Sequence, residues 1–168
     1  MSDWYVLHVK TGNELNVVNW IKILYPDIRM LTPQRILKER HEGKWKLVTR
    51  TLFPGYVFIL VHLSVDMYYY LNSVPNVIKI LGDNKIPKPV PEEEMQLVLK
   101  LSWRDDPLEI SNVILEGSEV NVVSGPLEGF IGKIEKIDPR RFRAKVKIEL
   151  MGEERIVELG INIVEKVD

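Results

Sequence analysis

Few residues in this chain have the types and spacing that catalysis or metal binding requires. There is no cysteine, which excludes thiol catalysis, disulfides and thiolate zinc sites. The three histidines are far apart and lack metal-ligand spacing: His8, His41 and His62. The glycines between residues 125 and 132 match neither a P-loop nor a dinucleotide fingerprint. We therefore expect a binding protein and not an enzyme, with no cofactor and no bound metal.

A cluster of basic residues around one aromatic lies near the C-terminus. Basic side chains bind phosphates, and an aromatic ring among them stacks on an unpaired base. The strict alternation over residues 143–150 predicts a strand with its basic side chains on one face. A solvated face of a small domain explains the same pattern, so the residues leave both interpretations open. The candidate RNA-binding residues are Lys133, Lys136, Arg140, Arg141, Phe142, Arg143, Lys145 and Lys147.

A second candidate site is the stretch LFPGYVFIL, residues 52–60. Its Pro-Gly pair predicts a tight corner, which leads directly into a hydrophobic strand. Because side chains alternate along a strand, Tyr56 and Phe58 share one face, and we expect that face to be partly exposed. Aromatic rings on a rigid corner make good anchors for a partner. The alternative is that some of these rings belong to the core.

The elements that position these residues form two groups. Residues 1–101 predict an α+β domain, in which an antiparallel sheet packs with helices. Its elements in order are a strand at 4–10, a helix at 13–25, a basic hairpin within 29–51, a strand at 56–61, a short helix from 64, a strand at 76–81 and a helix from 91. Residues 117–168 predict five short strands, which protect their edges by closing into a small barrel.

Residues 102–116 form a predicted connector between these two domains. It carries large apolar side chains, including Trp103, and is not a Gly/Ser tether. We expect it to be ordered and packed on a domain surface. An acidic segment, residues 92–119, separates basic blocks at 29–50 and 133–147, which also favours two modules with a connector.

The overall composition is that of a globular protein. The chain has 168 residues, of which 45% are hydrophobic and 28% are charged. No apolar run approaches the roughly 20 residues of a membrane span, and the first residues do not have the layout of a signal peptide. We expect a cytoplasmic protein with no membrane partner.

The chain resembles the NusG family of transcription elongation factors over nearly its whole length. Four of its segments resemble motifs of that family and occur in the same order as in the family. WYVLHVKTGNE resembles the first strand and helix start, and LFPGYVFIL the most specific N-terminal signature of that family. SVPNVIKILG resembles the segment that follows, and GSEVNVVSGPLEGFIGKIEKID the C-terminal KOW motif. The resemblance implies an NGN-like N-terminal domain followed by an SH3-like KOW barrel. The divergence resembles that of a specialised paralogue such as the LoaP antiterminators.

The resemblance also implies the partners. The N-terminal domain of the family docks on the clamp helices of RNA polymerase through an aromatic depression. The matching residues here are Trp4, Tyr5, Phe53, Tyr56 and Phe58. KOW modules in the family bind a termination factor, a ribosomal protein or nucleic acid. For this chain we expect nascent RNA, with an RNA hairpin as one form and non-template DNA as a further contact. We expect it to act as a monomer in processive antitermination.

Two alternatives to this function remain at the level of sequence. One is a general NusG-type factor whose KOW domain binds proteins, and the other is a ribosomal RNA-binding KOW protein. The chain also departs from the family pattern in one place. Where some relatives carry a Thr-rich element that touches the polymerase, residues 67–70 read Met-Tyr-Tyr-Tyr.

Overall fold

The computed structural model describes residues 1–102 and 106–167 and divides the chain into two compact units. The first unit comprises Met1–Pro33 and Phe53–Trp103, and the second comprises Gln34–Leu52 and Arg104–Asp168. The segment between the two parts of the first unit therefore folds with the C-terminal module. No helix in the described part of the chain is long and apolar enough to span a membrane.

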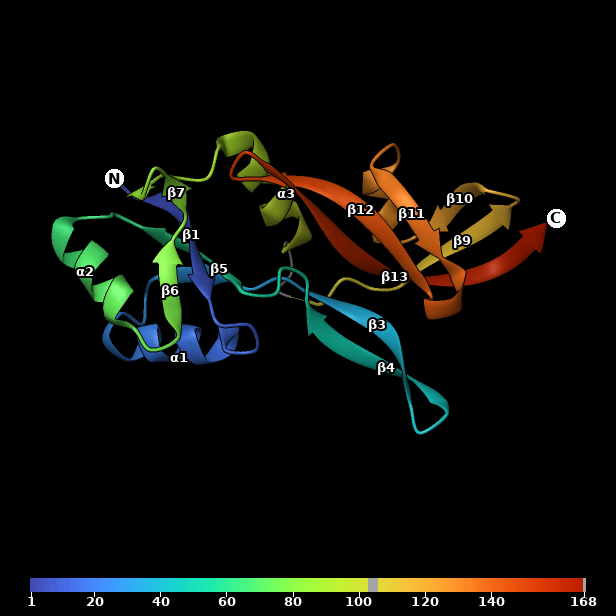
Figure 1. Ribbon diagram of the computed structural model, residues 1–168, viewed down its shortest axis with the longest axis horizontal. Coiled ribbons are helices and arrows are strands. Elements are labelled where there is room, and N and C mark those ends of the chain that lie inside the picture. The colour runs from blue at the N-terminus through green and yellow to red at the C-terminus, as the bar shows by residue number, and fades with distance from the viewer. Residues whose placement is uncertain (103–105, 168) are drawn as a thin grey trace. The chain divides into compact units, whose positions relative to one another are not determined.

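The first unit is a four-stranded sheet with helices, as the sequence predicts (Figure 1). The strands pair antiparallel in the order β2-β5-β1-β6. A small ribbon, β7 with β8, follows the sheet. The elements are β1 (Asp3–Val9), α1 (Glu14–Leu24), β2 (Arg29–Leu31), β5 (Tyr56–Val61), α2 (Val65–Ser73), β6 (Val77–Ile80), β7 (Gly82–Asp83), β8 (Ile86–Pro87) and α3 (Glu92–Leu101).

The main core of this unit lies between one face of the sheet and helices α1 and α2. The helix α1 contributes Val17, Val18 and Ile21, which recur at helical spacing and are all buried. Alternate residues of β1 and β5, such as Leu7 and Ile59, meet them from the sheet. This packing fixes which face of β1 and β5 points inward.

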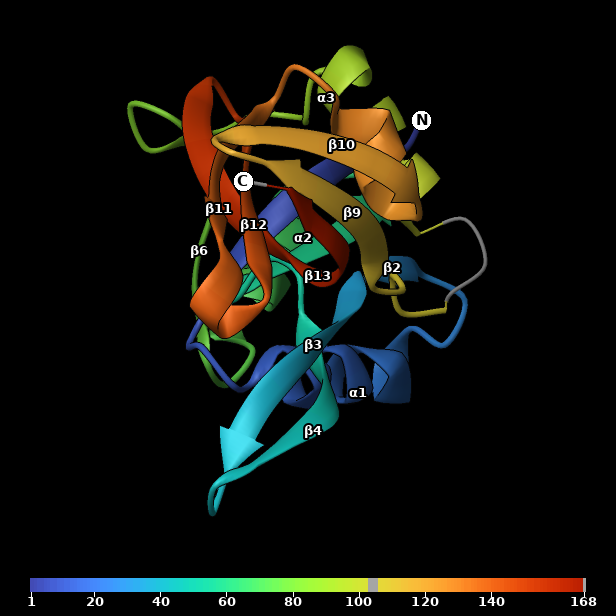
Figure 2. The same ribbon diagram turned by 90° about the vertical axis from the view of Figure 1, so that its right-hand side faces the viewer.

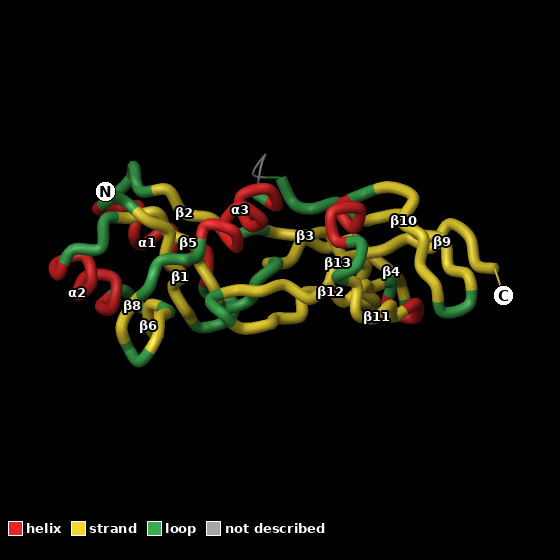
Figure 3. Tube along the Cα trace, turned by 90° about the horizontal axis from the view of Figure 1, so that it is seen from above, coloured by secondary structure: helices red, strands yellow, loops and turns green. Residues whose placement is uncertain are grey.

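The second unit consists of strands and two short 3₁₀ turns within the residues that the structure describes (Figure 3). Its five-stranded sheet has the order β10-β9-β13-β12-β11, with β9 and β13 parallel and the other pairs antiparallel. The elements are β3 (Gln34–His41), β4 (Lys44–Thr51), β9 (Ser111–Glu116), β10 (Glu119–Ser124), η1 (Pro126–Phe130), β11 (Ile134–Asp138), η2 (Pro139–Arg141), β12 (Arg143–Leu150) and β13 (Glu153–Val167).

The sheet of the second unit curves into an open barrel (Figure 2). Its two edge strands, β10 and β11, line one groove together, so the edges face each other. The long strand β13 pairs with β12 up to Gly160 and with β9 from Ile161 onward. It therefore joins the two halves of the curved sheet. The predicted alternation in β12 is confirmed, because Val146, Ile148 and Leu150 are buried.

The structure differs from the predicted domain boundaries in two places. Residues 111–116, which the sequence assigns to the connector, form β9, an inner strand of the barrel sheet between β10 and β13, where Val113 and Leu115 are buried. The hairpin of β3 and β4 groups with the barrel and not with the N-terminal domain. Both differences have one cause: long-range strand pairing is decided by the partner strand, which a local pattern does not contain. Trp103 lies outside the described residues.

Candidate binding surfaces

The pairing of β1 with β5 sorts the five predicted polymerase-binding residues by face. Trp4 lies opposite Leu60, and His8 lies opposite Tyr56, on the face that points away from the α1 and α2 core. Tyr5 pairs with Ile59 on the other face and is a buried member of the core. The structure therefore places Trp4 and Tyr56 on the same face of the sheet, with the Val6–Phe58 pair between them, and Tyr5 on the opposite face.

The expected exposure of Phe58 is wrong, and Phe53 is buried too. Phe58 has no exposed surface and Phe53 is 3% exposed; their rings meet edge to face with centroids 5.5 Å apart. Phe58 lies beside Val6 and Leu31 on neighbouring strands, and both are buried. The alternation rule gives the direction of a side chain but not its exposure, and β5 is covered on both faces at its centre.

The partly exposed residues of this face lie on either side of the buried Val6 and Phe58. We call them together the aromatic strip, made up of Trp4, Arg29 and Leu60 at one end and His8 and Tyr56 at the other. The rings of His8 and Tyr56 stack with centroids 5.3 Å apart. The Arg29 guanidinium lies 5.6 Å from the centre of the Trp4 ring. The strip combines partly exposed rings with one cation on a rigid sheet, which suits it to contacts with a protein partner.

The corner before Tyr56 is held by a buried carboxylate that the sequence analysis did not single out. Gly55 donates a backbone hydrogen bond to Glu14 Oε1 at 2.9 Å, and Gly12 donates to the same oxygen at 3.2 Å. Gly55 has a φ of +87°, and Tyr56 closes the turn by donating to the Phe53 carbonyl. An acidic residue at the first position of a predicted helix, just after a Gly turn, was the available signal.

The Met-Tyr-Tyr-Tyr segment is only partly available to a partner. Met67, Tyr68 and Tyr70 pack against the core of the first unit, whereas the Tyr69 side chain is 67% exposed. One tyrosine of this segment therefore projects into solvent.

In the second unit, the predicted RNA-binding residues fall into two groups. Lys133, Lys136 and Arg140 are exposed and Lys145 is partly exposed, and none of the four forms an ion pair with another described residue. Lys136 and Lys145 are opposite each other on β11 and β12. These four residues, which we call the barrel patch, remain candidates for phosphate contacts.

The other predicted basic residues form ion pairs with carboxylates of the same unit, and of these only Arg143 is buried. Arg143 is 8% exposed, and its guanidinium lies 2.8 Å from Glu158 and 3.8 Å from Glu39. Arg141 reaches Glu158 at 3.6 Å, and Lys147 approaches Glu135 and Glu154 at 3.7 and 3.9 Å. The expectation that Arg143 presents a free charge is wrong, because Glu158 on β13 pairs with it and Glu39 of the hairpin adds a second, longer contact.

Phe142 is also committed to internal packing. It has a left-handed backbone (φ +55°) at the end of η2. Lys38 Nζ lies 4.5 Å from the centre of its ring, and the Trp45 ring meets it edge to face at 4.9 Å. The expectation that Phe142 stacks on a base conflicts with these contacts, because Lys38 and Trp45 come from a hairpin about a hundred residues earlier in the chain.

Ion pairing and burial shift the pKa values of two charged side chains in the hairpin, Glu39 and Arg35. The hydrogen bond from Arg50 lowers the pKa of Glu39, and Arg143 and His41 act in the same direction. Burial lowers the pKa of Arg35 to about 10, so Arg35 still carries its charge at neutral pH. No group of His, Asp and Glu side chains within the described ranges has an arrangement that could hold a metal ion.

Comparison with known proteins gives the family. The model of the NusG family, described as transcription termination factor nusG, matches residues 2–99, and the KOW motif matches residues 116–149. The transcription termination/antitermination protein NusG of Helicobacter pylori (strain J99) is 30% identical over 176 aligned residues, covering 99% of both chains. The same protein of Rickettsia prowazekii is 30% identical, covering 100% of this chain and 92% of its own. A solved structure of Thermotoga maritima NusG, 27% identical, has a TM-score of 0.55 and covers 95% of this chain and 94% of its own. The chain therefore belongs to the NusG family.

Proposed function

We propose that this protein is a NusG-type transcription factor that binds RNA polymerase through the aromatic strip and contacts nascent RNA through its second unit. The observation that carries the proposal is the register of β1 and β5, which places Trp4 and Tyr56 on one partly exposed face. Family membership supports the polymerase as the partner. The role is non-catalytic, and it places the protein in the cytoplasm with the polymerase.

The strip acts as an anchor because its rings are already ordered. Tyr56 is held by the corner and by His8, so binding costs little side-chain entropy. Phe58 and Phe53 are buried and do not make the contact themselves. By binding the closed clamp more tightly than the open one, the protein shifts the polymerase toward its processive state.

Binding to purified core RNA polymerase tests this role. Trp4→Ala and Tyr56→Ala should each weaken binding by about 2 kcal/mol or more, which is roughly 30-fold. The matched control is Trp20→Ala, since Trp20 is a 50% exposed tryptophan on α1, outside the strip. Equal affinities for the strip variants and the control would refute the assignment.

The direction of regulation distinguishes two forms of the proposal. A specialised, LoaP-like factor would suppress termination only on transcripts that carry its RNA element. A general NusG-type factor would act on unrelated transcripts, and its KOW barrel would bind a termination factor or a ribosomal protein. The relatives are named for both termination and antitermination and match the chain over nearly its full length, which favours testing both.

Single-round transcription through an intrinsic terminator separates the two forms. We expect increased read-through when this protein is added to polymerase, and dependence on the upstream RNA sequence for the specialised form. Read-through that is independent of that sequence would identify the general form. A ribosomal KOW protein would leave transcription unchanged, and the match of the NusG model to residues 2–99 argues against it.

A further inference from the structure

The hairpin of β3 and β4 is built into the second unit through its backbone. Ile36 donates a hydrogen bond to the Leu108 carbonyl at 2.8 Å, and Leu108 donates to the Gln34 carbonyl at 2.8 Å. The strand β3 also lies close to β13 at Gly160. A side chain at this position would not fit, because a Cβ there would lie 2.5 Å from the Ile36 carbonyl oxygen. Leu37 is almost completely buried. The hairpin is therefore seated on the barrel by close contacts of its main chain.

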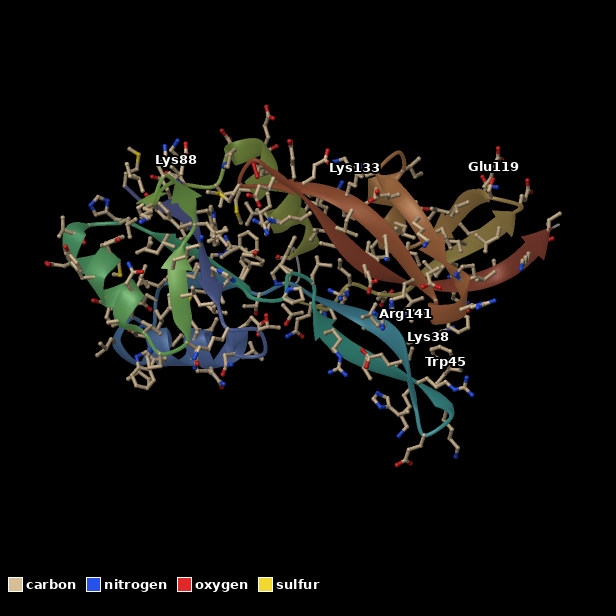
Figure 4. The ribbon with its side chains drawn as sticks, in the orientation of Figure 1. Lys38, Trp45, Lys88, Glu119, Lys133 and Arg141 are labelled. Carbon is tan, nitrogen blue, oxygen red and sulfur yellow. The ribbon has the colours of Figure 1, made fainter. Side chains whose placement is uncertain are left out.

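A cleft of about 470 Å³ lies where the hairpin meets the turn before β12, within the second unit. We call it the hairpin–barrel cleft. It is lined by four basic residues, one carboxylate and one tryptophan: Lys38, Arg40, Arg141, Arg143, Glu39 and Trp45. Figure 4 shows Lys38, Trp45 and Arg141 gathered at this place, whereas the labelled Lys133 lies elsewhere on the unit. The volume falls in the range of about 300–1,000 Å³ typical of ligand sites.

The lining residues differ in whether they are free to bind. Arg143 is paired with Glu158 and Glu39. Lys38 lies over the Phe142 ring and donates to Asn162 Oδ1 at 3.2 Å. These two residues hold the walls of the cleft in place.

Two arginines and the tryptophan remain available to a ligand. Arg40 is exposed, and the Arg141 side chain is 56% exposed with only a long 3.6 Å contact to Glu158. Trp45 is 43% exposed, since its contact with Phe142 is edge to face and not a full stack. Arg40 lies directly opposite Trp45 in the hairpin, so a cation and an aromatic ring face the cleft together.

We propose that the hairpin–barrel cleft binds single-stranded RNA, with a base stacked on Trp45 and phosphates held by Arg40 and Arg141. This inference rests on the proposed RNA contact of the second unit and moves its centre from the barrel patch to the cleft. A base offers a flat face to Trp45 while its backbone brings the negative charge that the arginines require. A uniform duplex fits less well, because its bases are already stacked and hidden from side chains.

The test uses the full chain and a fluorescent oligo(U) of about 10 nucleotides, with affinity measured by anisotropy over a series of salt concentrations. Trp45→Ala should weaken binding by about 5- to 150-fold, the range for loss of one base–aromatic stack, with little change in the salt slope. Trp45→Tyr retains a ring and should restore most of the affinity.

The charge variants have a matched control in the neighbouring arginine. Arg40→Gln and Arg141→Gln should each weaken binding and flatten the slope of log affinity against log salt by about 0.7 per lost phosphate contact. Arg140→Gln removes an exposed charge next in sequence that does not line the cleft, and should have a smaller effect. Thermal melting of every variant would show that the hairpin and barrel remain folded.

The outcomes separate the cleft from the wider proposal. Suppose that Lys136→Gln, Lys145→Gln and Arg140→Gln weaken binding, whereas the cleft variants bind oligo(U) as tightly as wild type. This result would overturn the proposed cleft site and leave RNA binding by the barrel patch. Wild-type protein that does not bind oligo(U) would overturn both. Equal affinity for oligo(U), duplex RNA and an acidic peptide would also overturn the cleft, because stacking would then contribute nothing.

Discussion

The two units make different use of the aromatic residues on their candidate surfaces. In the first unit, Trp4 and Tyr56 lie on adjacent strands of one sheet, and the buried Phe58 lies between their positions. In the second unit, Trp45 and Phe142 meet across nearly a hundred residues of sequence and are held by a hairpin docked on a barrel. A surface within one sheet depends on register, whereas a surface between two substructures depends on docking. The following changes should therefore affect the two units differently.

The largest effect should come from removing β9. A fragment of residues 117–168 lacks the strand that joins β10 to β13, so β10 has no partner and the barrel should not fold. Far-ultraviolet circular dichroism should show no cooperative thermal transition. Restoring residues 106–116 adds β9 and should recover a transition. A cooperative transition in the shorter fragment would mean that β9 is dispensable.

The next largest effect should be a difference in stability between removing the buried ring of Phe58 and removing the partly exposed ring of Tyr56 in the first unit. Phe58→Ala leaves a cavity in a fully buried site and should lower the free energy of unfolding by about 3–5 kcal/mol. Tyr56→Ala, at a partly exposed position on the same strand face, should cost markedly less stability while weakening polymerase binding. Urea denaturation of both variants measures the difference. Equal losses of stability would show that the two rings share one environment.

A smaller effect should follow from removing the carboxylate behind the corner. Glu14→Ala leaves the backbone N–H groups of Gly12 and Gly55 without their acceptor. The free energy of unfolding should fall by about 1–3 kcal/mol. Glu14→Gln keeps an oxygen acceptor and should lose less, which makes it the control. If both variants were as stable as wild type, the corner would be held by its own turn.

The smallest effect should be an acid dependence of the stability of the β3–β4 hairpin in the second unit. Because pairing with Arg50 lowers the pKa of Glu39, its contribution is present above the ordinary value of 4.5 and is lost as the pH falls through the lowered value. The contribution should stay below about 1 kcal/mol, since Arg50 is half exposed. Trp45 fluorescence in a variant lacking the other tryptophans would follow it. Glu39→Gln should remove this part of the acid response, and an unchanged response would exclude Glu39 as its source.

Local patterns were enough to predict most of the first unit. The helical spacing of Val17, Val18 and Ile21 predicted α1 and its buried face, and the Pro-Gly pair predicted the corner before β5. The alternation in β12 likewise predicted its inward residues. These features rest on interactions between residues that are close in sequence, where period and propensity dominate.

The exposure of individual residues could not be predicted in this way. Phe58 and Tyr56 have the same alternation and similar chemistry, yet one is fully buried and the other is partly exposed. Arg143 and Lys145 share a strand face, yet only Arg143 is enclosed, by Glu158 and Glu39. In both pairs the difference comes from a neighbour that is remote in sequence.

By itself, the sequence determined the family, the α+β and barrel modules and the two kinds of side chain that could meet a partner. Only the tertiary structure decided that β9 completes the barrel, that the hairpin docks beside Gly160, and that Trp45 is exposed whereas Phe142 is only partly exposed. The physical reason is that burial and pairing are set by contacts between distant segments. A strand's own residues specify its faces, but the partner that covers each face is chosen only when the whole chain folds.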